Sequence, residues 1–180
     1  TGKAHTQCIL TKIFHQTPIV YTRRVDFVPS GFSTRLKYKF TDKVVSISNV
    51  ISLILKKSGM YVDSPIISSA VKNKNLDIER ALKLKRSLGV KDSVKIIGLV
   101  SALESHKDPT TALKTIKELK KSRENFAVLH FGDGVLSDQV SNMVKKLNLS
   151  QLYFQLGYHE NVEDYFSIMD VFLMTSKEEG

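Results

Sequence analysis

The sequence is poor in cysteine, glycine and proline, and it has no long apolar run. Its single cysteine, Cys8, cannot form an internal disulfide, and five scattered histidines leave no Cys/His spacing typical of a metal site. Nine glycines and four prolines among 180 residues, with 42% hydrophobic and 25% charged residues, are typical of a globular protein rather than a disordered or fibrous one. The longest apolar stretches, such as residues 50–55, are far too short to span a bilayer. We therefore expect a folded protein in a reducing compartment, the cytoplasm.

Two features of the chain ends suggest a fragment of a longer protein. The first residue is Thr1 and not Met, and no signal peptide is visible. The last residue, Gly180, follows closely on an apolar, strand-like run. A length of 180 residues is typical of one domain or slightly more. We expect the chain to contain parts of two domains.

Charge is distributed unevenly along the chain, whose formal net charge is +9. Residues 1–71 carry 10 basic and 3 acidic side chains, whereas residues 72–180 carry 17 and 15. A basic first third indicates an anionic neighbour such as a membrane surface, nucleic acid or a phosphorylated substrate, and equally a solvated basic face. Aromatic residues are only 8%, and no nucleic-acid-binding motif accompanies the charge, so peripheral contact with an anionic membrane is favoured over nucleic acid.

Apolar runs rich in β-branched residues alternate with amphipathic stretches along the whole chain. We expect strands at 18–22, 43–47, 65–68, 94–100, 126–131, 152–156 and 171–175. We expect helices at 49–58, 77–88, 109–122, 135–147 and 162–168, with Ser48 and Asp108 as N-caps. This alternation predicts an α/β fold with parallel sheets flanked by helices. The polar stretch 72–80 places a domain junction near residue 70.

Parallel sheets bind ligands at the carboxyl ends of their strands, so the loops there hold the first candidates. Lys107 precedes a helix start, and an ammonium beside free helix N–H groups is a good phosphate site, although a surface lysine beside a cap has the same pattern. Gly132 and Gly134 would let the backbone approach a flat or anionic ligand, but such pairs also mark ordinary turns. His130 lies on the preceding strand, and we expect it to be a packed core residue.

Two further loops carry charged residues. Arg23 and Arg24 follow the first strand and could hold an anionic acceptor or a phosphate, or pair structurally with Asp26 or other acids. The sequence leaves both interpretations open. Residues 176–180 follow the last strand, where a carboxylate could accept hydrogen bonds from sugar hydroxyls or stabilise developing positive charge. An exposed acidic turn is the alternative there.

Taken together, these motifs resemble the group 1 glycosyltransferases, the retaining family four enzymes with the two-domain GT-B fold. The resemblance is most specific over residues 93–180. The matching motifs are HKDP at 106–109, FGDG at 131–134, LG at 156–157, VEDYF at 162–166, DVFL at 170–173 and SKEEG at 176–180. Earlier matches are TRRVDF at 22–27, DKVVSIS at 42–48 and, where the chain crosses between domains, IISSAVK at 66–72.

The resemblance implies two Rossmann-like parts and a role for each matching position. Residues 1–70 would end the N-terminal, acceptor-side domain, and residues 71–180 would begin the nucleotide-sugar-binding domain. Lys107 and Ser101 would bind the donor diphosphate, and Glu179, the first of the family's paired glutamates, would be catalytic and face the donor sugar. The nucleotide pocket would be lined by Gly132, Asp133, Gly134, Gly157 and Tyr158.

The implied reaction moves a sugar from a nucleotide-sugar donor to a glycan or lipid-linked acceptor, with retention of configuration, in polysaccharide or lipopolysaccharide biosynthesis. A fixed cation stabilises the negative charge that the leaving nucleoside diphosphate gains. No cofactor and no metal are expected. The expected partners are the nucleotide-sugar donor and a glycan or lipid-linked acceptor, with peripheral contact to an anionic membrane and no nucleic acid.

The chain departs from the family's pattern at three places. Ala102 stands where the family often has an arginine, so another cation, such as Arg23 or Arg24, would have to compensate. The second glutamate, eight residues after Glu179, lies beyond the sequence. The N-terminal glycine-rich loop and its histidine are also absent, and we do not equate His5 with that histidine. We therefore expect the fragment to be inactive alone, and a non-catalytic nucleotide-sugar-binding module or a nucleotide-sugar epimerase stays open as an alternative.

Overall fold

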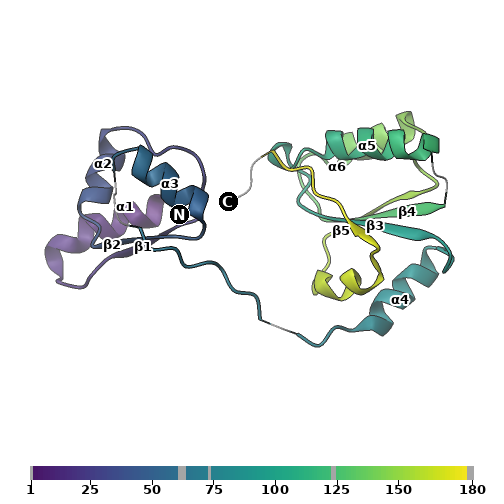
Figure 1. Cartoon of the computed structure of the whole chain (residues 1–180), viewed down its shortest axis with the longest axis horizontal. Coiled ribbons are helices and arrows are strands. Elements are labelled where there is room, and N and C mark those ends of the chain that lie inside the picture. Colours follow the sequence, from purple (N-terminus) through teal and green to yellow (C-terminus); the bar gives the residue numbers. More distant parts are fainter. Residues whose placement is uncertain (1, 61–63, 73, 123–124, 178–180) are drawn as a thin grey trace. The chain divides into compact units, whose positions relative to one another are not determined.

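The computed structural model describes residues 2–60, 64–72, 74–122 and 125–177 (Figure 1). They belong to two compact units, one within residues 2–72 and the other within residues 74–177. Both units contain parallel strands and helices, which confirms the predicted α/β class. None of the helices in these ranges is long and apolar enough to cross a membrane.

The first unit contains a two-stranded parallel sheet and three α-helices. Its elements are α1 (Gly2–Thr11), the 3-10 helix η1 (Lys12–Phe14), β1 (Val20–Arg23), α2 (Phe32–Lys39), β2 (Lys43–Ser46) and α3 (Asn49–Lys57). The register runs from Val20 opposite Lys43 to Arg23 opposite Ser46. Both strands were predicted to within two residues, whereas α1 and α2 were not predicted. Each of these two helices buries a single side chain, so neither has the apolar stripe that would mark it in the sequence.

Helix α3 begins and ends as its sequence predicts. The Ser48 hydroxyl caps it by accepting a hydrogen bond from the Ile51 amide over 3.3 Å, and Ile51 and Leu55 are its buried residues. Gly59 follows with a φ of +65°, as expected for a helix stop. The strand predicted at 65–68 is wrong, because this segment makes only an isolated parallel bridge between Ile66 and Ser46.

Histidine 5 has a structural place in the first unit. Its ring is buried and stacks on Tyr21 with centroids 4.0 Å apart, and its Nε2 lies 2.7 Å from the Thr41 hydroxyl. Burial, followed by the charges of Lys37 and the N-terminus, lowers the pKa of His5 below its usual value. The neutral ring therefore fixes α1 against β1 and the start of β2.

The second unit is a four-stranded parallel sheet with helices on both faces. Its elements are α4 (Ile78–Ser87), β3 (Lys95–Val100), η2 (Ser105–Lys107), α5 (Pro109–Ser122), β4 (Phe126–Phe131), α6 (Ser137–Lys146), β5 (Tyr153–Gly157), η3 (Val162–Ile168) and β6 (Val171–Phe172). The strand order is β5-β4-β3-β6. The last strand is shorter than the predicted 171–175, because only Val171 and Phe172 pair with β3.

Each face of this sheet buries its own apolar cluster. Helices α5 and α6 cover one face, and α4 with η3 covers the other (Figure 1). Strand β4 lies in the middle, and all six of its residues are buried. A strand buried on both faces reads as a continuous apolar run, which explains why β4 was predicted with its correct bounds. The predicted cap Asp108 is confirmed too, because its Oδ1 accepts from the Thr111 amide over 3.2 Å at the start of α5.

Candidate functional site

The carboxyl ends of β3, β4 and β5 surround a pocket of about 290 Å³ in the second unit. Its wall is mainly apolar. The lining residues are Val100, Ser101, Ala102, Phe131, Gly132, Asp133, Tyr158, His159 and Val162. Four of the predicted site residues, Ser101, Gly132, Asp133 and Tyr158, are among them. The other two predicted pocket glycines, Gly134 and Gly157, lie beside these residues and not in this lining.

The glycines after β4 let two loops pack closely. A Cβ at Gly132, whose φ is +137°, would lie 1.9 Å from the Ser101 carbonyl oxygen. A Cβ at Gly134 would lie 2.6 Å from the Leu103 carbonyl oxygen. Backbone hydrogen bonds join the loop after β4 to both of its neighbours, from the Leu103 amide to the Asp133 carbonyl (3.1 Å) and from the Gly132 amide to the Gly157 carbonyl at the end of β5 (2.7 Å). The glycines therefore let the loops after β3 and β4 pack against each other at the pocket, which is a structural role that needs no ligand.

The Asp133 side chain turns toward the start of α6. Its Oδ1 accepts hydrogen bonds from the Ser137 hydroxyl and from the Gly134 amide, the latter over 2.8 Å. These two bonds lower the pKa of the Asp133 carboxyl below its usual value. The carboxylate thus stays ionised at a helix N-terminus, where a negative charge is stabilised. Its hydrogen bonds join the loop after β4 to the first turn of α6.

A buried polar chain lies behind Ser101. His130 is 0% exposed, its Nε2 lies 3.3 Å from the Ser101 hydroxyl, and its Nδ1 lies 2.5 Å from the Tyr153 hydroxyl. Desolvation lowers the pKa of His130 and raises the pKa of Tyr153, so both side chains are neutral at pH 7. The prediction that His130 is a packed core histidine is confirmed. Its contact with a pocket residue was not predicted.

The loop that carries Lys107 meets the segment that follows β6. The Lys177 amide donates to the His106 carbonyl over 2.9 Å, and the Thr175 hydroxyl lies 3.3 Å from the Lys107 carbonyl and 3.0 Å from that of Asp108. The Lys177 ammonium lies 3.6 Å from the Asp108 carboxylate. Two loops far apart in sequence are thus joined at one edge of the sheet. Lys107 is half-buried and is not part of the pocket lining, and Glu179 lies outside the described residues.

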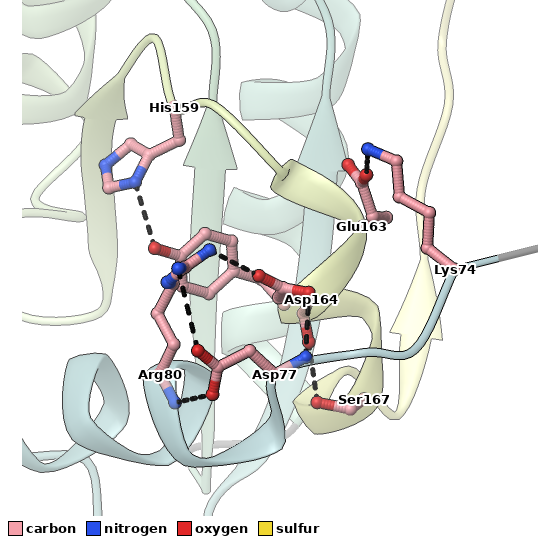
Figure 2. Close-up of polar contacts among 8 residues, drawn as sticks. Lys74, Asp77, Arg80, His159, Glu163, Asp164 and Ser167 are labelled. Atoms are coloured by element: carbon pink, nitrogen blue, oxygen red, sulfur yellow. Dashed lines mark hydrogen bonds and ion pairs between the residues drawn. The ribbon is translucent and has the colours of Figure 1, made fainter.

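Helix η3 supports the opposite wall of the pocket and is anchored to α4, as Figure 2 shows. Tyr165 stacks on Phe131 with centroids 4.7 Å apart, and its hydroxyl lies 3.2 Å from His159 Nδ1. The neighbouring Asp164 is 4% exposed and accepts hydrogen bonds from the Asp77 amide (2.9 Å) and Arg80 Nη1 (2.6 Å). Sequence reasoning missed this network, although it had noted both the polar segment 72–80 and the VEDYF motif.

An ion pair extends the same anchor to the segment before α4. Lys74 donates to the Glu163 carboxylate (Figure 2). Their hydrogen bond raises the pKa of the Lys74 ammonium and lowers the pKa of the Glu163 carboxyl. Two consecutive acidic residues of η3, one half-buried and one buried, therefore hold the two ends of the segment 74–80.

The two candidate arginines lie in the first unit. Arg23 is 2% exposed, and its guanidinium donates to the Tyr38 hydroxyl over 2.7 Å and to the Phe27 carbonyl. It also lies 5.1 Å from the centroid of the Phe27 ring. These contacts favour the structural interpretation of Arg23, with Tyr38 and Phe27 rather than Asp26 as its partners in the described part of the chain. Arg24 is exposed.

A Rossmann-like parallel sheet with a pocket at its carboxyl edge is the architecture of many nucleotide-binding domains. Residues 81–180 match the family model of the glycosyl transferases group 1. The match covers more than half of the chain, so the chain belongs to this family, as its motifs indicated. No curated protein sequence matches the chain.

Solved structures of glycosyltransferases have a similar fold. HepE from Anabaena, crystallised with UDP and glucose, is 17% identical with a TM-score of 0.80, over 98% of this chain and 51% of that chain. A glycosyltransferase from Rickettsia africae is 21% identical with a TM-score of 0.78, over 94% of this chain and 48% of that chain. The lipopolysaccharide outer core galactosyltransferase WaaB is 13% identical with a TM-score of 0.66, over 96% of this chain and 47% of that chain. The chain thus spans about half the length of these proteins. At such identities the similarity shows the fold.

Proposed function

We propose that this chain is part of a glycosyltransferase that moves a sugar from a nucleotide-sugar donor to a glycan or lipid-linked acceptor, with retention of configuration. One observation carries the proposal: the pocket at the carboxyl ends of β3, β4 and β5 lies within the family-matched stretch and is lined by four predicted site residues. HepE has been crystallised with UDP, with UDP and glucose, and with UDP-glucose, and a donor of the same class is proposed here.

The pocket suits the nucleoside part of such a donor. Its volume of about 290 Å³ and its mainly apolar wall fit a flat base, and the glycine-shaped loop after β4 forms part of that wall. Two lysines, Lys107 and Lys177, lie at the edge where the Lys107 loop meets residues 175–177, and Asp108 contacts the second of them. We assign the diphosphate to this edge, because a nucleoside diphosphate needs cations and hydrogen-bond donors next to the base pocket.

The proposed reaction needs charge stabilisation at the same edge. The acceptor hydroxyl oxygen forms a bond to the anomeric carbon while the bond from that carbon to the diphosphate oxygen breaks, and the departing diphosphate oxygen takes the acceptor's proton. The leaving diphosphate keeps the electron pair, and the Lys107 ammonium stabilises the negative charge that develops on it. Glu179 is assigned to the donor sugar through the family resemblance. Since the chain spans about half the length of the similar transferases, we assign the transfer to a two-domain protein that contains it.

A second candidate function is nucleotide-sugar binding without transfer. Ala102 favours it, because a methyl group lines the pocket where the family often places an arginine. Arg23 is a poor substitute for the missing arginine, since its guanidinium is hydrogen-bonded to Tyr38 within the first unit. A module of this kind would bind the nucleotide sugar without hydrolysing it or transferring its sugar.

Measuring turnover by a longer protein that contains this chain distinguishes the transferase from the binding module. A transferase hydrolyses or transfers the sugar of a nucleotide sugar, and Lys107→Ala and Glu179→Ala should each lower that rate more than tenfold. Lys114→Ala, an exposed lysine on the adjacent helix α5, is the matched control and should keep the full rate. Affinity without turnover would favour the binding module, and product analysis without an acceptor would detect an epimerase. Unchanged turnover in both site variants would remove the site assignment.

A further inference from the structure

Three neighbouring strands contribute one polar side chain each to a buried chain of hydrogen bonds. Ser101 directly follows β3, His130 lies in β4, and Tyr153 begins β5. His130 stands between the other two, with Nδ1 2.5 Å from the Tyr153 hydroxyl and Nε2 3.3 Å from the Ser101 hydroxyl. Only Ser101 lines the pocket. The chain therefore connects the sheet interior to one hydroxyl in the pocket wall.

The protonation states decide which way the hydrogen bonds run. The phenol of Tyr153 keeps its proton, and within the described residues its hydroxyl has His130 Nδ1 as its partner, so it donates to Nδ1. A neutral imidazole that accepts at Nδ1 carries its hydrogen on Nε2. That N–H faces Ser101, where the hydroxyl oxygen at 3.3 Å is one acceptor and the backbone carbonyl is a second. The Ser101 hydroxyl hydrogen is left for another acceptor.

Core packing alone does not require this arrangement. The other five residues of β4 are apolar, and an aliphatic side chain at position 130 would need no partner in a strand that is wholly buried. A buried histidine must satisfy both of its nitrogens. Here the second nitrogen is satisfied by a pocket residue, next to Ala102, which brings no donor of its own.

We propose that His130 is a positioning residue for Ser101: it holds the serine oxygen through Nε2–H, so that the serine O–H points to an anionic oxygen of the ligand in the pocket. The inference rests on the proposed function, in which that oxygen belongs to the donor diphosphate at the point where it leaves the base pocket toward the Lys107 edge, so Ser101 would contact the boundary between the two. A preoriented neutral donor to a charged acceptor contributes roughly tenfold to hundredfold in affinity.

The tautomer of His130 can be measured without any ligand. In a two-bond ¹H–¹⁵N NMR spectrum of the chain at pH 7, His130 should show one protonated and one unprotonated ring nitrogen, with the proton on Nε2. Tyr153→Phe removes the phenol O–H while keeping the ring, and should reduce the population of this tautomer. A charged His130 ring, or a proton on Nδ1, would overturn the inference whatever the ligand is.

The role of the chain in binding is tested with nucleotides. The chain is titrated calorimetrically with UDP, GDP and ADP, and the tightest of the three is compared with its nucleoside. Ser101→Ala and His130→Leu should each weaken the diphosphate about tenfold and leave the nucleoside unchanged, and the double variant should be no weaker than Ser101→Ala. His130→Gln, which keeps an N–H near the Nε2 position, should recover most of the affinity, and Tyr153→Phe covers the case in which His130→Leu does not fold.

The outcomes separate this inference from the proposed function. Equal loss for diphosphate and nucleoside, or additive effects in the double variant, would assign His130 a structural role only and overturn the inference, with nucleotide binding intact. Unchanged diphosphate affinity in Ser101→Ala would do the same. A wild-type chain that binds none of the three diphosphates would overturn the proposed function and this inference with it.

Discussion

Arg80 donates from Nη1 to the Asp164 carboxylate over 2.6 Å, although 84 residues separate them in the sequence. The carboxylate is almost fully buried and also accepts the amide of Asp77, the N-cap of α4. This contact fixes η3 to the beginning of α4. Since η3 supplies Val162 to the pocket and Tyr165 to its supporting wall, the anchor bears on the shape of the pocket as well as on stability.

Replacement of Asp164 should be costly, whereas replacement of its neighbour should not. Asp164→Ala leaves the Arg80 guanidinium and the Asp77 amide without their buried acceptor, and we expect a loss of about 2–4 kcal/mol in the free energy of unfolding. Glu163→Ala removes only the exposed contact with Lys74 and should change stability little. Urea unfolding of the chain measures both. Similar midpoints for the two variants would show that the buried contact contributes nothing special.

Gly132 and Gly157 offer a matched pair for testing the pocket floor. Both have positive φ, but a Cβ at Gly132 meets the Ser101 carbonyl, whereas nothing lies within 4 Å of a Cβ at Gly157. Gly157→Ala should therefore cost only the left-handed strain, about 1–2 kcal/mol. Gly132→Ala must also push apart the loops after β3 and β4, so it should cost clearly more and abolish nucleotide binding.

Unfolding curves and nucleotide titrations of both variants check this difference. If Gly132→Ala proves as mild as Gly157→Ala, the two loops are less tightly packed than their geometry indicates. Retained nucleotide affinity in Gly132→Ala would separate the loop contact from the binding site.

The second unit was readable from the sequence because its strands are buried on both faces. Strands β3, β4 and β5 were predicted within one residue, and the loops that follow them line the pocket. Helices α1 and α2 were missed because each buries one residue. The strands predicted at 65–68 and 171–175 were wrong or too long, because an apolar run does not tell how many of its residues find a pairing partner.

The contacts across strands could not be read in the same way. That His130 lies between Ser101 and Tyr153 depends on the register of three strands, which the sequence pattern does not specify. His159 was missed because one partly exposed histidine carries no pattern of its own. The anchor between Arg80 and Asp164 joins two polar segments, and polarity alone indicates solvent rather than a buried partner.

The stability of the chain should fall as the pH drops below 6.5. Burial lowers the pKa of His130 in the folded state below the ordinary value of 6.5, which the unfolded chain keeps. At a pH between these two values, the unfolded chain therefore binds more protons than the folded chain. The stability that the neutral His130 ring contributes is fully present above pH 6.5 and is lost on acidification. For one proton, the free energy of unfolding falls by at most about 1.4 kcal/mol per pH unit. His5 adds a contribution of the same sign.

Unfolding free energies at pH 7.5, 6.5, 5.5 and 5.0 measure this slope. His130→Leu should be less stable at every pH but should show a shallower slope than the wild-type chain. The carboxyls with lowered pKa, such as Asp133 and Asp170, lose their contribution only below about pH 4 and do not disturb this range. An identical slope in wild type and variant would mean that His130 titrates normally in the folded chain.

The cation that replaces the missing arginine is the remaining question at the diphosphate edge. We expect Lys177 to supply it, because its backbone is bonded to His106 and its ammonium lies 3.6 Å from Asp108, on the loop that carries Lys107. Lys177→Ala should weaken the nucleoside diphosphate about threefold to tenfold and leave the nucleoside unchanged. Ala102→Arg, introduced into that variant, should restore the affinity, since it places a guanidinium where the family often has one. Calorimetric titration measures the nucleotide affinity of the wild type, of Lys177→Ala and of the double variant, with Lys114→Ala as the control. If Lys177→Ala binds as tightly as the wild type while Ala102→Arg gains nothing, the diphosphate lies elsewhere and the assignment of this edge is wrong.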